Sequence, residues 1–222
     1  MELKYKNWKE ITVNKFLELQ QIEKNYERTG DDDLDTINRA VAILQVLCDA
    51  TEDEILNLPK DVFSSLLKQT DFLLEMPKAK ITNKYFINGK RYNVFLEMNN
   101  MTVSQYIDFQ TFYKQQDKYT KEMIACFLIP EGKKYGEYDI NEVINDIGNH
   151  MSIVDAHSIL FFFIILSVSL TRVTLNCSIK DMKKMMRKEK NKEQRMKMEQ
   201  AIQEMKKAAR SLKNGAGYTF WT

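Results

Sequence analysis

The sequence predicts a mainly α fold (α+β): a multi-helix domain with one β-hairpin, followed by a long basic carboxyl-terminal helix. Seven glycines and three prolines in 222 residues are too few for the turns of a β-sandwich or barrel. Apolar residues recur at helical spacing along most of the chain, and one segment is β-prone on both sides of Asn-Gly. With 44% hydrophobic residues, the chain is long enough to bury a core.

The first half begins with helices that follow capping residues. Thr12 is placed to cap a helix running to about Glu27. The acidic residues 31–33 precede a second apolar stripe, where the helix dipole favours negative charge, so they indicate a helix start. Residues 51–54 form a capping box for a short helix, and a further helix starts near Asp61.

A β-hairpin is predicted near residues 84–96. Two β-prone runs, 84–87 and 90–96, flank Asn88-Gly89, the dipeptide that accepts positive φ at both central turn positions. An isolated hairpin is marginal in water. We therefore expect it to lie on a neighbouring helix or to pair with a strand of another molecule.

Helices are predicted again after the hairpin. A second capping box, residues 102–105, starts one helix, and another runs from about Lys118 to Ile129, before Pro130. A loop over 131–136 leads to a helix beginning near Asp139.

A long apolar helix is expected after Ser152, and it contains the unbroken apolar run 159–166. A spanning helix needs about 20 apolar residues. The uncharged window from Ala156 to Thr171 is shorter and is polar at its ends, so a buried core helix is the preferred interpretation. Insertion of residues 153–175 into a membrane is the alternative.

The composition changes after about residue 178. Residues 177–213 hold thirteen lysines and arginines against five aspartates and glutamates, a local net charge of +8 in a chain whose total is +2. We expect three regions: a helical domain over 1–178, one long basic, methionine-rich helix over 179–213, and a flexible aromatic tail over 214–222. Methionine adapts to irregular apolar grooves. The predicted partner-binding residues are Met182, Met185, Met186, Met196, Met198, Tyr218, Phe220 and Trp221.

No catalytic, cofactor or metal site is predicted, and the protein is expected to be non-enzymatic. The chain has three unpatterned cysteines and two histidines, and it lacks nucleophile-elbow, Walker and zinc motifs. His150 and His157, near Asp146 and Asp155, suggest a metal only weakly because Ser152 starts a new helix between them.

Three roles compete for the basic helix: a solvated surface helix, a partner-protein or coiled-coil element, and a contact with nucleic acid or anionic membrane. Nucleic acid is disfavoured because residues 182–211 hold no aromatic side chain for base stacking. The charged hairpin turn, residues 88–91, is interpreted as an exposed turn.

Four segments together resemble tail assembly chaperones of tailed bacteriophages. They are residues 8–12, the hairpin at 87–90, residues 102–110 and residues 127–135, and a lysine-rich carboxyl end follows them. The resemblance implies a morphogenesis protein of the infected bacterial cytoplasm that binds the tape measure protein or another tail component, or a minor protein of the virion. Phage tail or virion proteins and further copies of the chain are the expected partners. The alternatives are membrane association through 153–175 and contact with nucleic acid in the virion.

Overall fold

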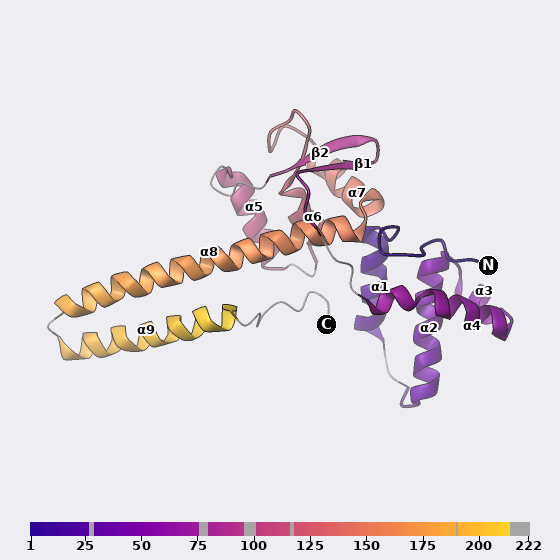
Figure 1. Cartoon of the computed structure of the whole chain (residues 1–222), viewed down its shortest axis with the longest axis horizontal. Helices are drawn as coiled ribbons and strands as arrows, with labels where there is room; N and C mark the ends of the chain where they lie inside the picture. Colours follow the sequence, from indigo (N-terminus) through magenta and orange to yellow (C-terminus); the bar gives the residue numbers. More distant parts are fainter. Residues whose placement is uncertain (27–28, 76–79, 96–100, 116–117, 190, 214–222) are drawn as a thin grey trace. The chain divides into compact units, whose positions relative to one another are not determined.

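The protein is mainly α with a small antiparallel sheet, which confirms the predicted fold class (Figure 1). The computed structural model describes residues 1–26, 29–75, 80–95, 101–115, 118–189 and 191–213, except the side chains of 164–174, 208, 209 and 211–213. The described elements are α1 (Val13–Asn25), α2 (Asp32–Cys48), α3 (Glu52–Leu56), α4 (Lys60–Gln69), the 3₁₀ helix η1 (Asp71–Leu74), β1 (Lys84–Ile87), β2 (Lys90–Val94), α5 (Val103–Tyr113), α6 (Thr120–Ala125), β3 (Leu128–Pro130), α7 (Ile140–His150), α8 (Ile153–Lys188) and α9 (Lys192–Lys213).

The chain divides into two compact units, Met1–Leu160 and Phe161–Thr222, with α8 contributing to both. In the first unit, α1 packs against α2 and α7, and α6 packs against α5 and α7. The predicted boundary at residue 178 and the observed division after Leu160 both fall within α8, which continues without a break through each position. The predicted aromatic tail, residues 214–222, lies outside the described residues.

Four predicted helix starts are confirmed. The side chains of Thr12, Asp31, Thr51 and Asp139 each accept a hydrogen bond from a backbone amide two or three residues later, at the starts of α1, α2, α3 and α7. Each bond satisfies an amide that the first turn of a helix leaves without a partner. The acidic residues at 31–33 are thus a helix start, as expected.

The capping box predicted at the start of α5 is half correct. Thr102 accepts from the amide of Gln105, but the Gln105 side chain does not return to the cap. Its amide nitrogen instead donates to the carbonyl oxygen of Cys126 at 2.6 Å, where Gln105 is buried. The capping box does not form because the Gln105 side chain instead hydrogen-bonds to the buried carbonyl of Cys126, just beyond the end of α6.

The β-hairpin is confirmed over the described residues 84–94; Leu96, its predicted last residue, lies outside them. Asn88 and Gly89 both have positive φ, 49° and 74°, and Ile87 pairs with Lys90 across the two-residue turn. α7 packs against β1. The expectation that a helix supports the hairpin therefore holds.

A third strand was missed by the sequence analysis. β3 pairs antiparallel with β2, with Leu128 opposite Val94 and Pro130 opposite Tyr92. The helix predicted to run to Ile129 therefore ends early, with α6 stopping at Ala125. Residues 127–129 are β-prone, and the free edge of β2 offers them a ladder; Pro130 is tolerated because it ends an edge strand.

The starts of α1 and α8 are tied together by backbone pairing. Thr12 and Ser152 form an antiparallel bridge, and the amide of Ile153 donates to the carbonyl of Ile11 at 2.8 Å. Ile11, Ile153 and the adjoining Met151 are buried. Ser152 also accepts from the amide of Asp155, as expected of the residue that precedes the long helix.

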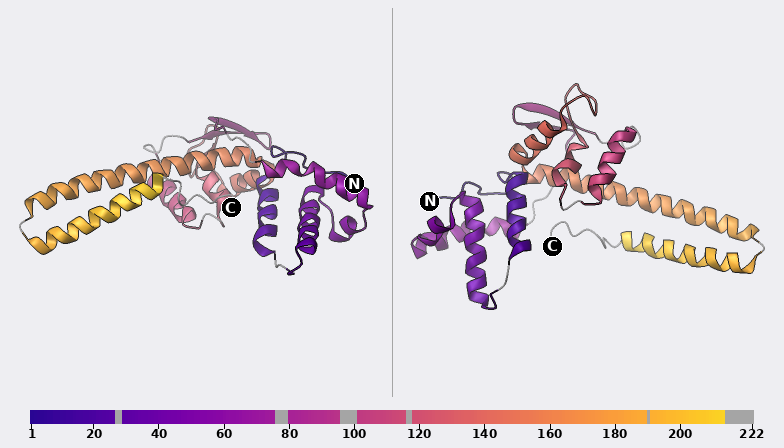
Figure 2. Two further views of the ribbon diagram at one scale, coloured as in Figure 1. Left: turned by 60° about the horizontal axis from the view of Figure 1, so that its bottom comes forward. Right: turned by 180° about the vertical axis from the view of Figure 1, so that it is seen from behind.

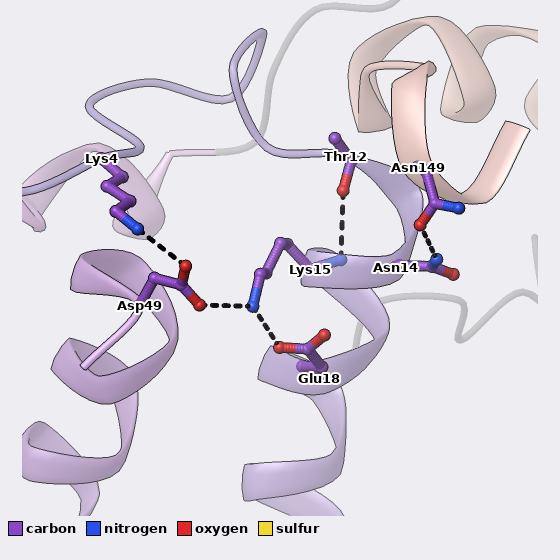
Figure 3. A network of polar contacts seen from close by, with 7 residues as sticks. All are labelled: Lys4, Thr12, Asn14, Lys15, Glu18, Asp49 and Asn149. Carbon is purple, nitrogen blue, oxygen red and sulfur yellow. Dashed lines mark hydrogen bonds and ion pairs between the residues drawn. The ribbon is translucent and has the colours of Figure 1, made fainter. Parts of the chain in front are cut away.

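A surface network joins the amino-terminal segment, α1 and the end of α2 (Figure 3). Asp49 follows α2 in the left-handed conformation, with φ 54°. Its carboxylate accepts from Lys4 at 2.7 Å and lies 3.5 Å from the ammonium of Lys15, which also pairs with Glu18 at 2.8 Å. Lys4 lowers the pKa of Asp49 by hydrogen bonding.

Gly148 allows α1 and α7 to approach closely. A Cβ atom at this position would lie 2.8 Å from the side-chain amide of Asn14. That amide is held in place, because it donates to Asn149 at 2.7 Å (Figure 3). It also accepts from Lys121 at 3.0 Å. A side chain larger than hydrogen at 148 would therefore disturb the contact between the two helices.

The apolar run at 159–166 is partly core. Ile159, Leu160 and Phe163 are buried, whereas Phe161 is 52% exposed. Ile164 to Leu166 lie outside the described side chains. Among the described residues, no helix has both the length and the apolar character needed to cross a membrane.

Candidate partner-binding surface

The predicted basic helix is in fact two helices. α8 ends at Lys188 and α9 begins at Lys192, and they run antiparallel and side by side in every view (Figures 1 and 2). The side chain of Asn191 accepts from the amides of Glu193 and Gln194, and so caps α9. The single helix predicted over 179–213 is therefore wrong: a local cap starts a second helix, which the sequence analysis treated as continuous.

A narrow apolar seam runs along the two helices, which together are called the helical hairpin below. Its fully buried members are Ile179 in α8 and Ile202 in α9, 8% and 3% exposed. Half-buried residues continue the seam along each helix in steps of three and four positions, the spacing of antiparallel coiled coils. They are Leu175, Met182 and Met186 in α8, and Met198 and Met205 in α9.

The structure separates the predicted methionine contacts into two groups. Met182, Met186 and Met198 lie half-buried in the seam, so their first role is to hold the helices together. Met185 and Met196 lie outside the seam, and each is 53% exposed. The other predicted contacts, Tyr218, Phe220 and Trp221, lie outside the described residues.

A second exposed apolar surface, on α5, was missed by the sequence analysis. Val103, Tyr106 and Ile107 are 76%, 50% and 57% exposed, and their spacing places them on one face of the helix. The opposite face is anchored by Gln105 and by Phe109, whose ring meets Phe127 edge to face at 5.0 Å. Apolar residues occur all round this helix, so its sequence does not reveal which face is covered.

A buried carboxylate holds the β-hairpin on α7. Asp146, 1% exposed, accepts from Asn88 at 2.8 Å, from Lys90 at 2.8 Å and from Tyr92 at 2.6 Å. Burial alone would raise the pKa of Asp146, but hydrogen bonds from Lys90, Tyr92 and Asn88 outweigh it and hold that pKa below its usual value. The predicted exposed turn is thus bonded to a helix through two of its residues.

These bonds also shift the pKa values of the groups around Asp146. Hydrogen bonds to Asp146 and to Glu142 raise the pKa of Lys90, and burial raises the pKa of Tyr92. Lys90 therefore stays an ammonium and Tyr92 a neutral donor at neutral pH. In the sequence alone, Asp146 suggests only a weak metal ligand.

The weak metal interpretation gains no geometric support. His150 lies exposed at the end of α7, while His157 is half-buried in α8, where burial lowers its pKa. Asp155 accepts from the hydroxyl of Ser152. Among the described residues, no group of three or more histidine, cysteine or acidic side chains is arranged to hold a metal ion.

A buried thiol lies near a hydrogen-bonded tyrosine and aspartate. Burial raises the pKa of Cys126 to about 12, and its Sγ lies 3.9 Å from the hydroxyl of Tyr135. That hydroxyl donates to Asp108 at 2.8 Å. Because a thiol is nucleophilic as the thiolate, this arrangement disfavours nucleophilic chemistry near neutral pH.

Charge is distributed unevenly between the two units. Residues 1–160 hold 19 basic and 26 acidic residues, a net charge of −7, while residues 161–222 hold 14 and 5, a net charge of +9. The exposed methionines of the helical hairpin thus lie on a strongly basic element, while the apolar face of α5 belongs to an acidic unit.

Comparisons with protein-family models, with curated proteins and with solved structures found no match.

Proposed function

We propose that the protein is a non-enzymatic bacteriophage assembly protein that binds a tail component, such as the tape measure protein, in the cytoplasm of the infected host. The observation that carries the proposal is the pair of exposed methionines, Met185 and Met196, on the helical hairpin. Flexible thioether side chains suit binding to apolar helices of varied sequence, as an assembly factor requires.

The apolar face of α5 supports the same function. Val103, Tyr106 and Ile107 together expose aliphatic and aromatic surface on a helix whose other face is fixed by buried contacts. A rigid helix that presents residues at i, i+3 and i+4 matches the way in which helical partners are recognised. Tyrosine is among the residues enriched in binding hot spots.

The test is capture of the tape measure protein by the tagged full-length chain, with both proteins expressed from the same phage genome. Replacing Met185 and Met196 by glutamate places charge in the apolar contact, and we expect recovery of the tape measure protein to fall at least tenfold. The matched control replaces the same two residues by leucine, which keeps the contact apolar and retains capture. Equal recovery with the glutamate and leucine variants would show that these methionines are not the contact.

A further inference from the structure

Folding the basic segment back on itself gathers its cations on one side. Successive residues of a helix are rotated by about 100°, so the seam through Ile179 and Ile202 fixes where every other side chain lies. On one flank, the positions lying roughly 20° to 100° around the helix from Ile179 or Ile202 hold seven basic residues whose side chains the structure describes, counted on both helices because these run antiparallel. These residues, called the basic face below, are Lys180, Lys183 and Arg187 of α8 and Lys192, Arg195, Lys206 and Arg210 of α9.

The two flanks of the helical hairpin differ in charge. On the basic face the same positions include one carboxylate, Glu199. The opposite flank, taken as the positions roughly 140° to 180° from the same isoleucines, carries Asp181, Glu193 and Glu204 together with Lys184, Lys188, Lys197 and Lys207. The helical hairpin is therefore strongly cationic on one side and nearly neutral on the other.

The cations of the basic face form no ion pair within 4.0 Å among the described residues. Among the described residues of 175–213, the one ion pair within 4.0 Å joins Lys197 to Glu193 at 2.7 Å, on the opposite flank. Lys206 is half-buried, and the other six side chains of the basic face are exposed. A cationic surface without internal partners is available to an external anion.

The composition of the basic face identifies the kind of anion. Its positions hold no apolar residue, whereas a protein interface normally has an apolar or aromatic centre. Residues 164–213 contain no aromatic side chain, so stacking on unpaired bases is excluded as a source of affinity in this region. What remains is contact with regularly spaced phosphates, and duplex nucleic acid presents these most densely.

We propose that the basic face binds the phosphate backbone of double-stranded nucleic acid without sequence preference. From the level of Lys206 to that of Lys192 it extends about 20 Å at 1.5 Å per residue, which covers several phosphates on each strand. This activity is distinguishable from the proposed binding of a tail protein, because the charge variants that test it leave Met185 and Met196 unchanged. Failure of either proposal leaves the other standing.

The test is fluorescence anisotropy of a labelled 30-base-pair random-sequence DNA duplex titrated with the full-length protein. With about five phosphate contacts, we expect affinity to fall roughly 500-fold between 50 and 200 mM salt. Reversing two charges of the basic face, Lys183→Glu with Arg187→Glu, should weaken binding at least 30-fold at 50 mM salt. The matched control makes the same charge change on the other flank, Lys188→Glu with Lys197→Glu, and should weaken binding less than threefold.

Two further measurements give the proposal clear ways to fail. The charge-conserving variant Lys183→Arg with Arg187→Lys should bind like the wild type, and circular dichroism should be unchanged in all variants. Equal losses in the two charge-reversal variants, or no binding at 50 mM salt, would overturn the proposal. So would tighter binding to vesicles containing 30% phosphatidylserine than to the duplex, or a salt-sensitive self-association, followed by sedimentation, that only the basic-face variant abolishes.

Discussion

The two units of the molecule are held together in different ways. In residues 1–160, polar side chains from distant elements meet in buried contacts, and Asp146 alone joins three residues of the β-hairpin to α7. In the described part of 161–213, the buried side chains are three: Phe163, Ile179 and Ile202. In the first unit, loss of one buried polar group leaves its partners without a hydrogen bond. The second unit is held by a narrow apolar seam, which leaves its outer surface free to bind partners.

The largest effect should come from Asp146→Ala. The substitution leaves Lys90, Tyr92 and Asn88 without their shared acceptor, and we expect the first unit to lose about 3 kcal/mol of unfolding free energy. Urea unfolding followed by circular dichroism measures this loss. The control, Glu142→Ala, removes the other partner of Lys90. Because the Glu142 side chain is 62% exposed, this substitution should lower the unfolding free energy by less than about 0.5 kcal/mol. Equal losses would contradict the central role of the buried carboxylate.

A smaller effect, confined to the second unit, should follow from Ile202→Ala. Truncating this buried side chain removes seam packing worth about 2 kcal/mol. Hydrogen exchange should quicken in α9 and in the facing part of α8, while the amides of α7 keep their protection. Gln203→Ala, at an exposed neighbouring position, serves as the control. Faster exchange in α7 as well would mean that the two units unfold together.

The smallest expected effect concerns the reactivity of the three thiols. Burial raises the pKa of Cys48 and that of Cys126, to about 12 for the latter, so their thiolates form only as the pH rises far above neutrality. Cys177 on the helical hairpin is exposed. At pH 8 we expect one thiol to react rapidly with Ellman's reagent and two to react only after denaturation. In a Cys177→Ser variant the rapid phase should disappear; its persistence would place a reactive thiol in the first unit.

Local signals predicted much of the fold. The caps at Thr12, Asp31 and Thr51 and the turn at Asn88-Gly89 follow from bonds made within a few residues, and each is confirmed. β3 was missed because its strand character depends on β2, which lies far away in the sequence. The break between α8 and α9 depends on Asn191, which caps α9. In the sequence, this asparagine cannot be told from a polar residue within one continuous helix.

The candidate surfaces were predicted less well than the helices. Exposed Met185 and seam-forming Met182 look alike in the sequence, since both belong to one methionine-rich segment. The seam can be recognised only when a second helix is known to pack against the first. The basic face has the same origin, because Lys183 and Arg195 are gathered on one side by the reversal of the chain.

The bridge between Thr12 and Ser152 has a consequence for synthesis on the ribosome. The amino-terminal segment is made first, but its backbone partner and the buried Met151 and Ile153 emerge only after most of the chain has been translated. Until then Ile11 remains exposed, and such long-range closure is slow to form. The helical hairpin is built from neighbouring segments and closes quickly. The first unit should therefore stay incomplete until residue 153 has been made, whereas the helical hairpin needs only its own two neighbouring helices.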